Sequence, residues 1–228
     1  MLRFFVNLFH FIRWIYIDLY RHVKAGRKHF REYGLTMYCG RQGGGKTISV
    51  VDYLERMRVK YPRALIFTNF GYLNQHAPLE GWQTLIEERS ADGVIFAIDE
   101  IHSEFSSNAW KDFPPSLLRE ISQQRKQRVK IIATAQVFKD VAVQLRRQCF
   151  DVVECRTLGG RWTFQRCFDA EDYNSFIESS STPDRKFKIR RKYRRSFIQT
   201  DEIRELFDTY AKIEAMTKVG FQPVQRID

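Results

Sequence analysis

Runs of apolar residues alternate along most of the chain with segments whose apolar residues recur at helical spacing. The run at 93–98 is apolar throughout, which is typical of a strand in a parallel sheet that is covered on both faces. Strands are predicted at 35–39, 63–67, 93–98 and 129–135. Helices are predicted between them, at 47–59, 79–89 and 114–126. Strands that alternate with helices indicate an α/β fold with a doubly wound parallel sheet.

The pattern changes after residue 140. A short helix is expected at 141–148, and two strands at 150–156 and 162–167 flank a Gly-Gly pair, which predicts a β-hairpin. Thr200 with two acidic residues after it has the pattern of a helix N-cap, and it predicts a helix to about residue 218.

Residues 1–31 form an apolar segment in which the polar side chains occupy one narrow stripe of the expected helix. This pattern fits a buried core helix, a helix in a membrane interface, or a transmembrane span. A span would place Arg13 and Asp18 in hydrocarbon at a high free-energy cost. Because a basic cluster follows at 22–31, the sequence favours attachment to a membrane surface.

The segment 179–228 begins with Ser and Pro and soon becomes strongly basic. Eight of the eleven residues at 185–195 are Lys or Arg, and three apolar residues at odd positions predict a strand with one apolar face. Such dense charge repels itself unless a polyanion is near, although a solvated face is the plain alternative. Lipid headgroups would satisfy the same charges. We favour DNA phosphates, contacted by Arg190, Arg191, Arg194 and Arg195.

Composition adds to this picture. The 228 residues include 38 Lys and Arg against 27 Asp and Glu, a formal net charge of +11. A hydrophobic content of 43% excludes a wholly disordered chain. The positive charge favours a nucleic acid or an anionic membrane as partner, although solubility alone also accounts for it. Four cysteines form no CxxC pair, which predicts reduced core thiols in a cytosolic protein.

Residues 40–47 carry the clearest chemistry, because they match the GxxxxGK[ST] pattern of a P-loop between a predicted strand and a predicted helix. The glycines let backbone N–H groups surround a phosphate, and the helix N-terminus adds partial positive charge. The predicted nucleotide-binding residues are Gly40, Arg41, Gln42, Gly43, Gly44, Gly45, Lys46 and Thr47. Lys46 is expected to neutralise the β- and γ-phosphates of ATP, and the Thr47 hydroxyl to bind Mg²⁺.

Two later strands end in polar residues that suit the same site. Asp99 follows the 93–98 run and is placed to reach the Mg²⁺ of a P-loop, and Glu100 to activate a water as general base. Gln136 follows the 129–135 run and is placed to contact the γ-phosphate or the water. We therefore predict Glu100, Lys46 and Gln136 as catalytic residues, with Thr47 and Asp99 as metal ligands.

These three segments resemble the additional-strand, catalytic-glutamate P-loop ATPases. The stretch IDEIHSEF…ISQQRKQRVKIIATAQVFKDVAVQLRRQC is similar to the zonula occludens toxin-like ATPases of the FtsK–HerA superfamily, and the resemblance extends over about 34–167. It implies a RecA-like fold and a motor or assembly ATPase that is membrane-associated and oligomeric. Filamentous-phage assembly ATPases typically carry a transmembrane span after this domain, whereas here the apolar segment comes first. That difference favours genome packaging or another DNA-translocation role.

The resemblance also implies an arginine finger, because ring ATPases place an arginine of a neighbouring subunit at the γ-phosphate. The candidates are Arg119, Arg125 and Arg128, then Arg146 and Arg147, although each is individually typical of a solvated surface. His102 is either a partner of Glu100 or a structural residue.

The predicted organisation is an amphipathic helix at 1–31, a P-loop ATPase domain at 32–178, and a basic segment with a C-terminal helix at 179–228. The expected function is ATP-driven DNA translocation, in viral genome packaging or virion assembly at a membrane, by a homo-oligomer for which a ring is one arrangement. We expect it in the cytoplasm, on the cytoplasmic or virion membrane surface, or within the virion. The alternatives are a membrane-bound assembly or secretion ATPase that acts on protein, and a P-loop kinase.

Overall fold

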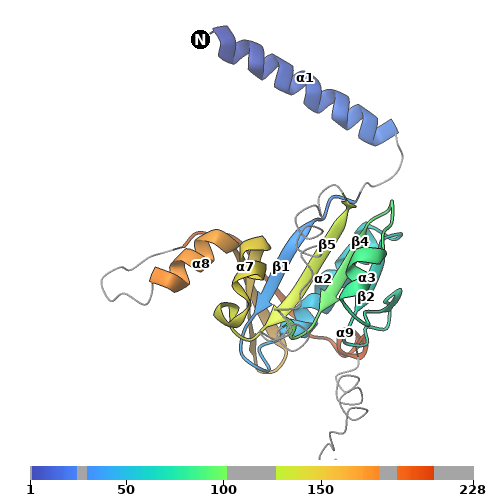
Figure 1. The fold of residues 1–228 in the computed structure, drawn as a ribbon, viewed down its shortest axis with the longest axis vertical. Helices are drawn as coiled ribbons and strands as arrows, with labels where there is room; N and C mark the ends of the chain where they lie inside the picture. Colours follow the sequence, from blue (N-terminus) through green and yellow to red (C-terminus); the bar gives the residue numbers. More distant parts are fainter. Residues whose placement is uncertain (1, 25–29, 102–126, 180–188, 208–228) are drawn as a thin grey trace, which may run out of the picture.

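The computed structural model describes residues 2–24, 30–101, 127–179 and 189–207. Its centre is an eight-stranded sheet with the order β3-β2-β4-β5-β1-β6-β7-β8 (Figure 1). The strands up to β6 pair in parallel, and β7 and β8 are antiparallel additions. Their bounds are β1 Gly34–Cys39, β2 Leu65–Thr68, β3 Ala77–Pro78, β4 Val94–Ile98, β5 Val129–Ala135, β6 Cys149–Leu158, β7 Trp162–Asp169 and β8 Arg191–Ile198. The predicted α/β fold and the β6–β7 hairpin are confirmed.

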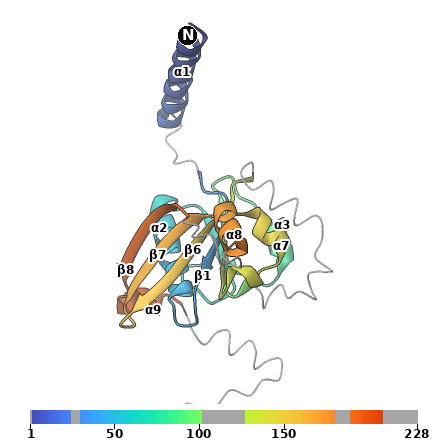
Figure 2. The same ribbon diagram turned by 90° about the vertical axis from the view of Figure 1, so that its left-hand side faces the viewer.

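Helices cover both faces of the sheet (Figures 1 and 2). One face packs against α2 (Lys46–Lys60) and the short α9 (Asp201–Glu205). The other face packs against α3 (Trp82–Glu87), α7 (Val143–Gln148) and α8 (Ala170–Ser179), with the 3-10 turn η2 (Phe138–Asp140) beside them.

Two hydrophobic cores result from this arrangement. Ile95 of β4 packs with Leu54 of α2 on one face, whereas its neighbour Phe96 packs with Leu85 of α3 on the other. All five residues of β4 and all seven of β5 are buried. The continuous apolar runs seen in the sequence are therefore those of central strands covered on both faces.

Helix α1 (Leu2–Lys24) stands apart from this body (Figures 1 and 2). Its large apolar side chains remain open to solvent; Phe4, Phe9 and Tyr16, for example, are each 67–69% exposed. The alternative in which this helix packs into the chain's own core does not occur. Among the described residues, no helix combines the length and the hydropathy that crossing a bilayer requires.

The remaining differences from the sequence prediction lie at the edges. Helix α8 was not predicted, and β8 starts later than the expected strand at 185–195. Because β8 pairs with β7, the described part of 179–228 continues the central sheet. Phe30 is 5% exposed and packs against Tyr61, so the folded domain begins at or before this residue. The helix predicted from Thr200 to about residue 218 ends at Glu205, because Phe207 instead forms an isolated β-bridge with Tyr72. The predicted helix at 114–126 and residues 208–218 lie outside the described residues.

Candidate nucleotide-binding site

The loop between β1 and α2 has the backbone of an anion cradle. Gly43 and Gly45 have φ values of 72° and 83°, in the left-handed region that favours glycine. A Cβ on Gly45 would clash with the Thr157 hydroxyl oxygen, so no larger side chain fits unless the Thr157 side chain moves. Gly45 is also the N-cap of α2, where free backbone N–H groups suit a phosphate.

The Lys46 side chain is held inside this site. It is only 6% exposed, and its Nζ lies 3.4 Å from a carboxylate oxygen of Glu100 and 3.5 Å from the Arg41 carbonyl oxygen. Two residues from distant segments, both predicted to be catalytic, are therefore in direct contact.

Asp99 lies at the carboxyl end of β4, between two hydroxyl groups. Thr47 donates a hydrogen bond of 2.9 Å to Asp99 Oδ1, and Thr134 of β5 donates one of 2.7 Å to the same oxygen. The predicted metal ligands Thr47 and Asp99 thus lie side by side, and their oxygen atoms are of the kind that Mg²⁺ prefers. The described residues contain no cluster of three or more His, Cys, Asp or Glu that would hold a metal by itself.

Asn69 and Thr134 hold the two acidic residues in place, and sequence reasoning did not identify either of them. Asn69 accepts a hydrogen bond of 2.7 Å from the Asp99 N–H and donates one of 3.2 Å to the Asp99 carbonyl. The Thr134 hydroxyl accepts one of 2.8 Å from the Glu100 N–H. Both lie at or just beyond the carboxyl ends of strands next to β4, which is the sequence feature that could have indicated them.

Glu100 has a backbone conformation that is unusual for its residue type. Its φ is 52°, a left-handed value that costs a residue with a side chain of the order of 1–3 kcal/mol. The side chain is 22% exposed and faces Lys46. Strained residues of this kind concentrate at functional sites, where surrounding contacts maintain them.

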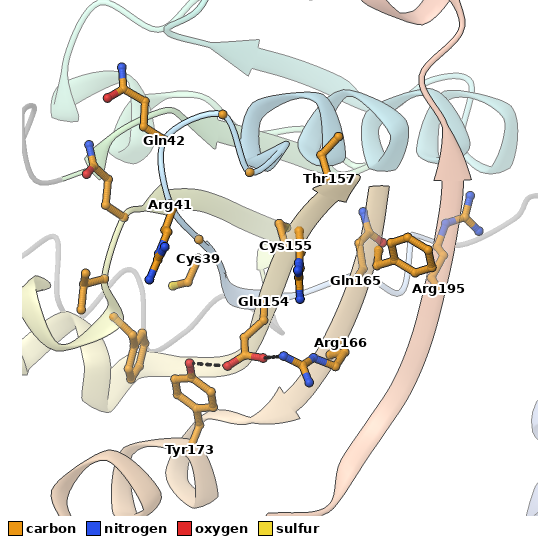
Figure 3. Close-up of a pocket in the computed structure, with 18 of the residues that line it drawn as sticks. Cys39, Arg41, Gln42, Glu154, Cys155, Thr157, Gln165, Arg166, Tyr173 and Arg195 are labelled. Carbon is orange, nitrogen blue, oxygen red and sulfur yellow. Dashed lines mark hydrogen bonds and ion pairs between the residues drawn. The ribbon is translucent and has the colours of Figure 1, made fainter. Parts of the chain in front are cut away.

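Gln136 follows β5 directly and is exposed at the same edge of the sheet. It lines a cavity of about 1310 Å³ that extends from the P-loop, including Arg41 and Gln42, across β6 and β7 to α8 (Figure 3). Within it, Glu154 accepts a hydrogen bond of 2.9 Å from Tyr173 and pairs with Arg166 at 2.8 Å. Burial and the neighbouring Glu154 carboxylate raise the pKa of the Tyr173 hydroxyl, which therefore remains a donor.

The candidate arginine fingers lie elsewhere or outside the described residues. Arg128 precedes β5 whereas Gln136 follows it, so the two lie at opposite ends of a strand about 23 Å long. The Arg128 guanidinium donates to the Ala91 carbonyl and does not face the P-loop of its own chain. Arg146 donates to Asn174 at 3.0 Å, and Arg147 lies beside it in α7. Arg119, Arg125 and His102 lie outside the described residues.

The four candidate DNA contacts divide into two groups. Arg190, Arg191 and Arg194 are exposed along the edge of the sheet. Arg195 points to α2, where its guanidinium donates hydrogen bonds of 3.2 Å and 3.1 Å to the two carboxylate oxygens of Asp52. Alternate residues of a strand face opposite sides, so neighbours in one basic run have different environments.

The four cysteines are free thiols, and Cys39, Cys155 and Cys167 are buried. Burial raises the pKa of Cys149 and that of Cys155 to about 12 and that of Cys167 to about 11, which keeps these thiols protonated and unreactive at neutral pH.

Comparison with solved structures finds many similar chains, including the following two. The N-terminal domain of zonular occludens toxin from Neisseria meningitidis superposes with a TM-score of 0.52 at 16% identity, over 80% of this chain and 98% of that one. B204, the DNA-packaging ATPase from Sulfolobus turreted icosahedral virus, gives a TM-score of 0.48 at 11% identity, over 62% of this chain and 94% of that one. No protein-family model and no curated protein sequence matches the chain. The chain therefore shares the fold of the toxin's N-terminal domain, as its sequence resemblance implies.

Proposed function

We propose that this chain is an ATPase that uses ATP hydrolysis to translocate DNA, in viral genome packaging or virion assembly at a membrane. The observation that carries the proposal is the convergence of Lys46, Asp99 and Glu100 at the P-loop. Thr47 and Asp99 are 52 positions apart in sequence yet share a hydrogen bond, and Lys46 meets Glu100 beside them. This set combines phosphate binding, metal binding and water activation in one place.

The proposed chemistry uses each group in turn. The P-loop N–H groups and Lys46 bind the β- and γ-phosphates. Thr47 and Asp99 would hold Mg²⁺, which would neutralise phosphate charge. Glu100 accepts a proton from the attacking water while the water oxygen forms a bond to the γ-phosphorus. The bond between the γ-phosphorus and the bridging β-phosphate oxygen breaks, and ADP and phosphate are the products. Gln136 orients the γ-phosphate or that water.

The Lys46–Glu100 pair adds a further element to this scheme. The Lys46 Nζ lies 3.4 Å from a carboxylate oxygen of Glu100. Phosphates compete for that ammonium because they carry more negative charge. Their binding therefore releases the carboxylate for water activation.

Substitution at these two positions tests the ATPase part of the proposal. Lys46→Ala is expected to abolish or strongly weaken ATP binding, because it removes the charge on the phosphates. Glu100→Gln is expected to bind Mg²⁺-ATP while turnover falls by about 10²-fold or more, as for loss of a general base. Nucleotide binding and phosphate release measured on both variants check this, and normal turnover by Glu100→Gln would contradict the assigned role.

Three further parts of the proposal concern partners. The exposed Arg190, Arg191 and Arg194 suit DNA phosphates, and the uncovered apolar surface of α1 suits a membrane surface. We also propose a homo-oligomer, arranged as a ring, in which Arg119, Arg125 or Arg128 of one subunit reaches the site of the next.

ATPase activity measured with and without double-stranded DNA separates the candidate functions. Stimulation by DNA supports translocation. DNA-independent hydrolysis favours the alternative of a membrane-bound assembly or secretion ATPase that acts on protein. Transfer of the γ-phosphate to a small molecule would indicate a kinase, which Glu100 and Gln136 make the weakest of the three.

A further inference from the structure

A second cavity, of about 490 Å³, lies on the α2 face of the sheet. It is bounded by α2, β8 and the amino-terminal parts of β1, β5 and β6. The first cavity extends from the P-loop at the carboxyl end of β1, whereas the second includes Glu32 and Thr36 toward its amino end, and both linings include Arg194 and Arg195 of β8. Of the lining of the second cavity, the proposed function uses Arg194 alone, as a DNA contact.

Lys130, the second residue of β5, provides the unusual feature of this cavity. Its side chain is 6% exposed although it carries an amine. The Nζ atom donates to the Thr36 hydroxyl at 2.7 Å and to the Tyr33 carbonyl at 3.2 Å, which are its hydrogen bonds within the described part of the chain. An ammonium group has three N–H bonds, so one donor remains for the cavity.

No carboxylate among the described residues lies within ion-pair distance of the Lys130 amine. The two acidic side chains of the lining are engaged by other lysines: Glu32 pairs with Lys60 at 2.7 Å, and Asp151 pairs with Lys192 at 2.7 Å. Burial lowers the pKa of Lys130, while these two carboxylates act in the opposite direction from farther away. A buried ammonium without a paired anion is costly, because protein replaces its hydration.

The rest of the lining is also rich in cations and in hydroxyl groups. Asp52 is the shared partner of two of its arginines and balances the charge of one. The lining has five basic residues against two acidic ones, and its three tyrosines add hydroxyl groups; the basic residues are Arg56, Lys60, Lys130, Arg194 and Arg195.

We propose that this cavity binds a phosphate-bearing anion, with Lys130 as its buried counter-charge. The oxygens of a phosphate group accept hydrogen bonds from ammonium, guanidinium and phenol donors, and charge-assisted bonds of this kind are the strong ones. The volume is ample for a phosphate monoester or diester head.

The position of the cavity suggests two sources for such an anion. Glu32 lines it, and the chain leads from there through Phe30 toward α1. An anionic phospholipid headgroup can therefore reach it if α1 lies on a membrane, and soluble phosphate or a phosphate ester can reach it from water. Both sources present the same chemistry to Lys130.

Phosphate-dependent stability of the full chain tests the proposal. Every protein in this test carries Lys46→Ala, so that phosphate binding at the P-loop is as weak as possible. Inorganic phosphate is titrated at constant ionic strength, and the midpoint of thermal unfolding is measured. A ligand that binds only the folded state raises this midpoint. Lys130→Met, which keeps the length of the side chain and removes its charge, is expected to weaken the apparent phosphate affinity at least tenfold.

Two comparisons distinguish a binding site from a structural lysine. Without phosphate, Lys130→Met is expected to keep or raise the thermal midpoint, because an apolar side chain replaces an unpaired buried charge. If the variant instead lowers the midpoint by the same amount with and without phosphate, Lys130 only ties β5 to β1 and the proposal fails. Absence of any phosphate effect on the parent chain overturns it as well.

Milder variants keep the test informative if Lys130→Met does not fold. Lys60→Gln and Tyr53→Phe alter the cavity rim and are expected to weaken phosphate severalfold, whereas Arg63→Gln removes an exposed charge outside the cavity and serves as the control. Equal phosphate affinity in these three variants contradicts the proposal.

Short-chain phosphatidylglycerol, added as monomers, identifies the source of the anion. Binding at least tenfold tighter than that of inorganic phosphate indicates a lipid headgroup, and equal binding indicates a soluble anion.

Discussion

Gly45 brings the P-loop against the β6–β7 hairpin. Its missing Cβ leaves room for Thr157, whose hydroxyl lies 2.9 Å from that of Thr163. Gln199 donates to Thr163 at 2.7 Å and so holds this pair from the far side. The neighbours of Gly45 therefore cannot move aside freely.

A matched pair of glycine substitutions measures this constraint. Both Gly45→Ala and Gly43→Ala place alanine at positive φ, with a cost of about 1–3 kcal/mol of stability. Only Gly45→Ala also drives a methyl group into Thr157, since nothing lies within 4 Å of the Gly43 position. We expect Gly45→Ala to weaken nucleotide binding at least tenfold more than Gly43→Ala, measured with a fluorescent ATP analogue alongside urea unfolding. Equal losses would show that contact with β6 does not matter.

At the scale of single residues, the sequence predicted the groups that touch phosphate better than the groups that position them. Lys46 and Glu100 belong to local motifs whose spacing is visible in the chain. Asn69 and Thr134 hold the Asp99–Glu100 backbone only because β2 and β5 flank β4 in the sheet. This strand order is a property of the tertiary structure and is not visible in a local motif. Arg195 was grouped with Arg194, but the alternation of a strand places it against Asp52.

At the scale of elements, the sequence predicted the strands whose burial on both faces requires apolar residues. The predicted strand at 129–135 coincides with β5, because a central strand must be apolar on both faces. Helix α8 escaped prediction because its sequence AEDYNSFIES mixes charged and apolar residues over only ten positions. Its Tyr173 and Ile177 pack against the core only once η2 and β6 are in place.

A deletion that removes helix α1 but keeps Phe30 leaves the contacts of the folded domain intact. Deletion of residues 1–24 is expected to release the protein from anionic vesicles, because it removes the uncovered apolar face, while nucleotide binding persists. Deletion of residues 1–31 should in addition lower the thermal midpoint, since Phe30 packs on Tyr61 with ring centroids 4.9 Å apart. Vesicle co-sedimentation and thermal unfolding check both statements. Vesicle binding that survives the shorter deletion would exclude α1 as the anchor.

Glu55 couples α2 to the loop after β2, and this contact makes stability depend on pH. Burial alone would raise the pKa of Glu55, but hydrogen bonds from Tyr72, Asn74 and Arg58 outweigh it and lower the pKa below its ordinary value near 4.5. The folded state therefore favours the ionised carboxylate. Its contribution is present above the ordinary pKa and is lost as the pH falls through the lower, folded-state pKa.

Unfolding between pH 6 and pH 3 measures this contribution. We expect Glu55→Gln to cost roughly 1–3 kcal/mol at pH 6 and to lose less stability on acidification than the parent chain. Glu87→Gln, at an exposed position of α3, is the control and should follow the parent curve. Parallel curves for all three proteins would mean that Glu55 carries no acid-dependent stability.

At the scale of the whole molecule, β8 joins the proposed DNA surface to the helix that begins at the P-loop. Arg195 of β8 binds Asp52 of α2, and Asp52 also pairs with Arg56 at 3.1 Å. The bidentate ion pair therefore ties β8 to α2. In the proposed function, adjacent arginines have separate roles: Arg194 binds DNA and Arg195 holds the strand.

Charge reversal separates these two roles. Arg191→Glu combined with Arg194→Glu is expected to lower DNA affinity and to flatten the log–log dependence of that affinity on salt by about 1.8, since each phosphate contact contributes about 0.9. Stability should change little, because both side chains are exposed. Arg195→Ala should instead leave the salt dependence intact and lower the unfolding midpoint, because Asp52, 12% exposed, loses its bidentate partner. Fluorescence anisotropy with double-stranded DNA over a range of salt concentrations, paired with urea unfolding, gives both quantities. If Arg195→Ala flattened the salt dependence and the double reversal did not, the DNA surface would lie on the α2 face of β8.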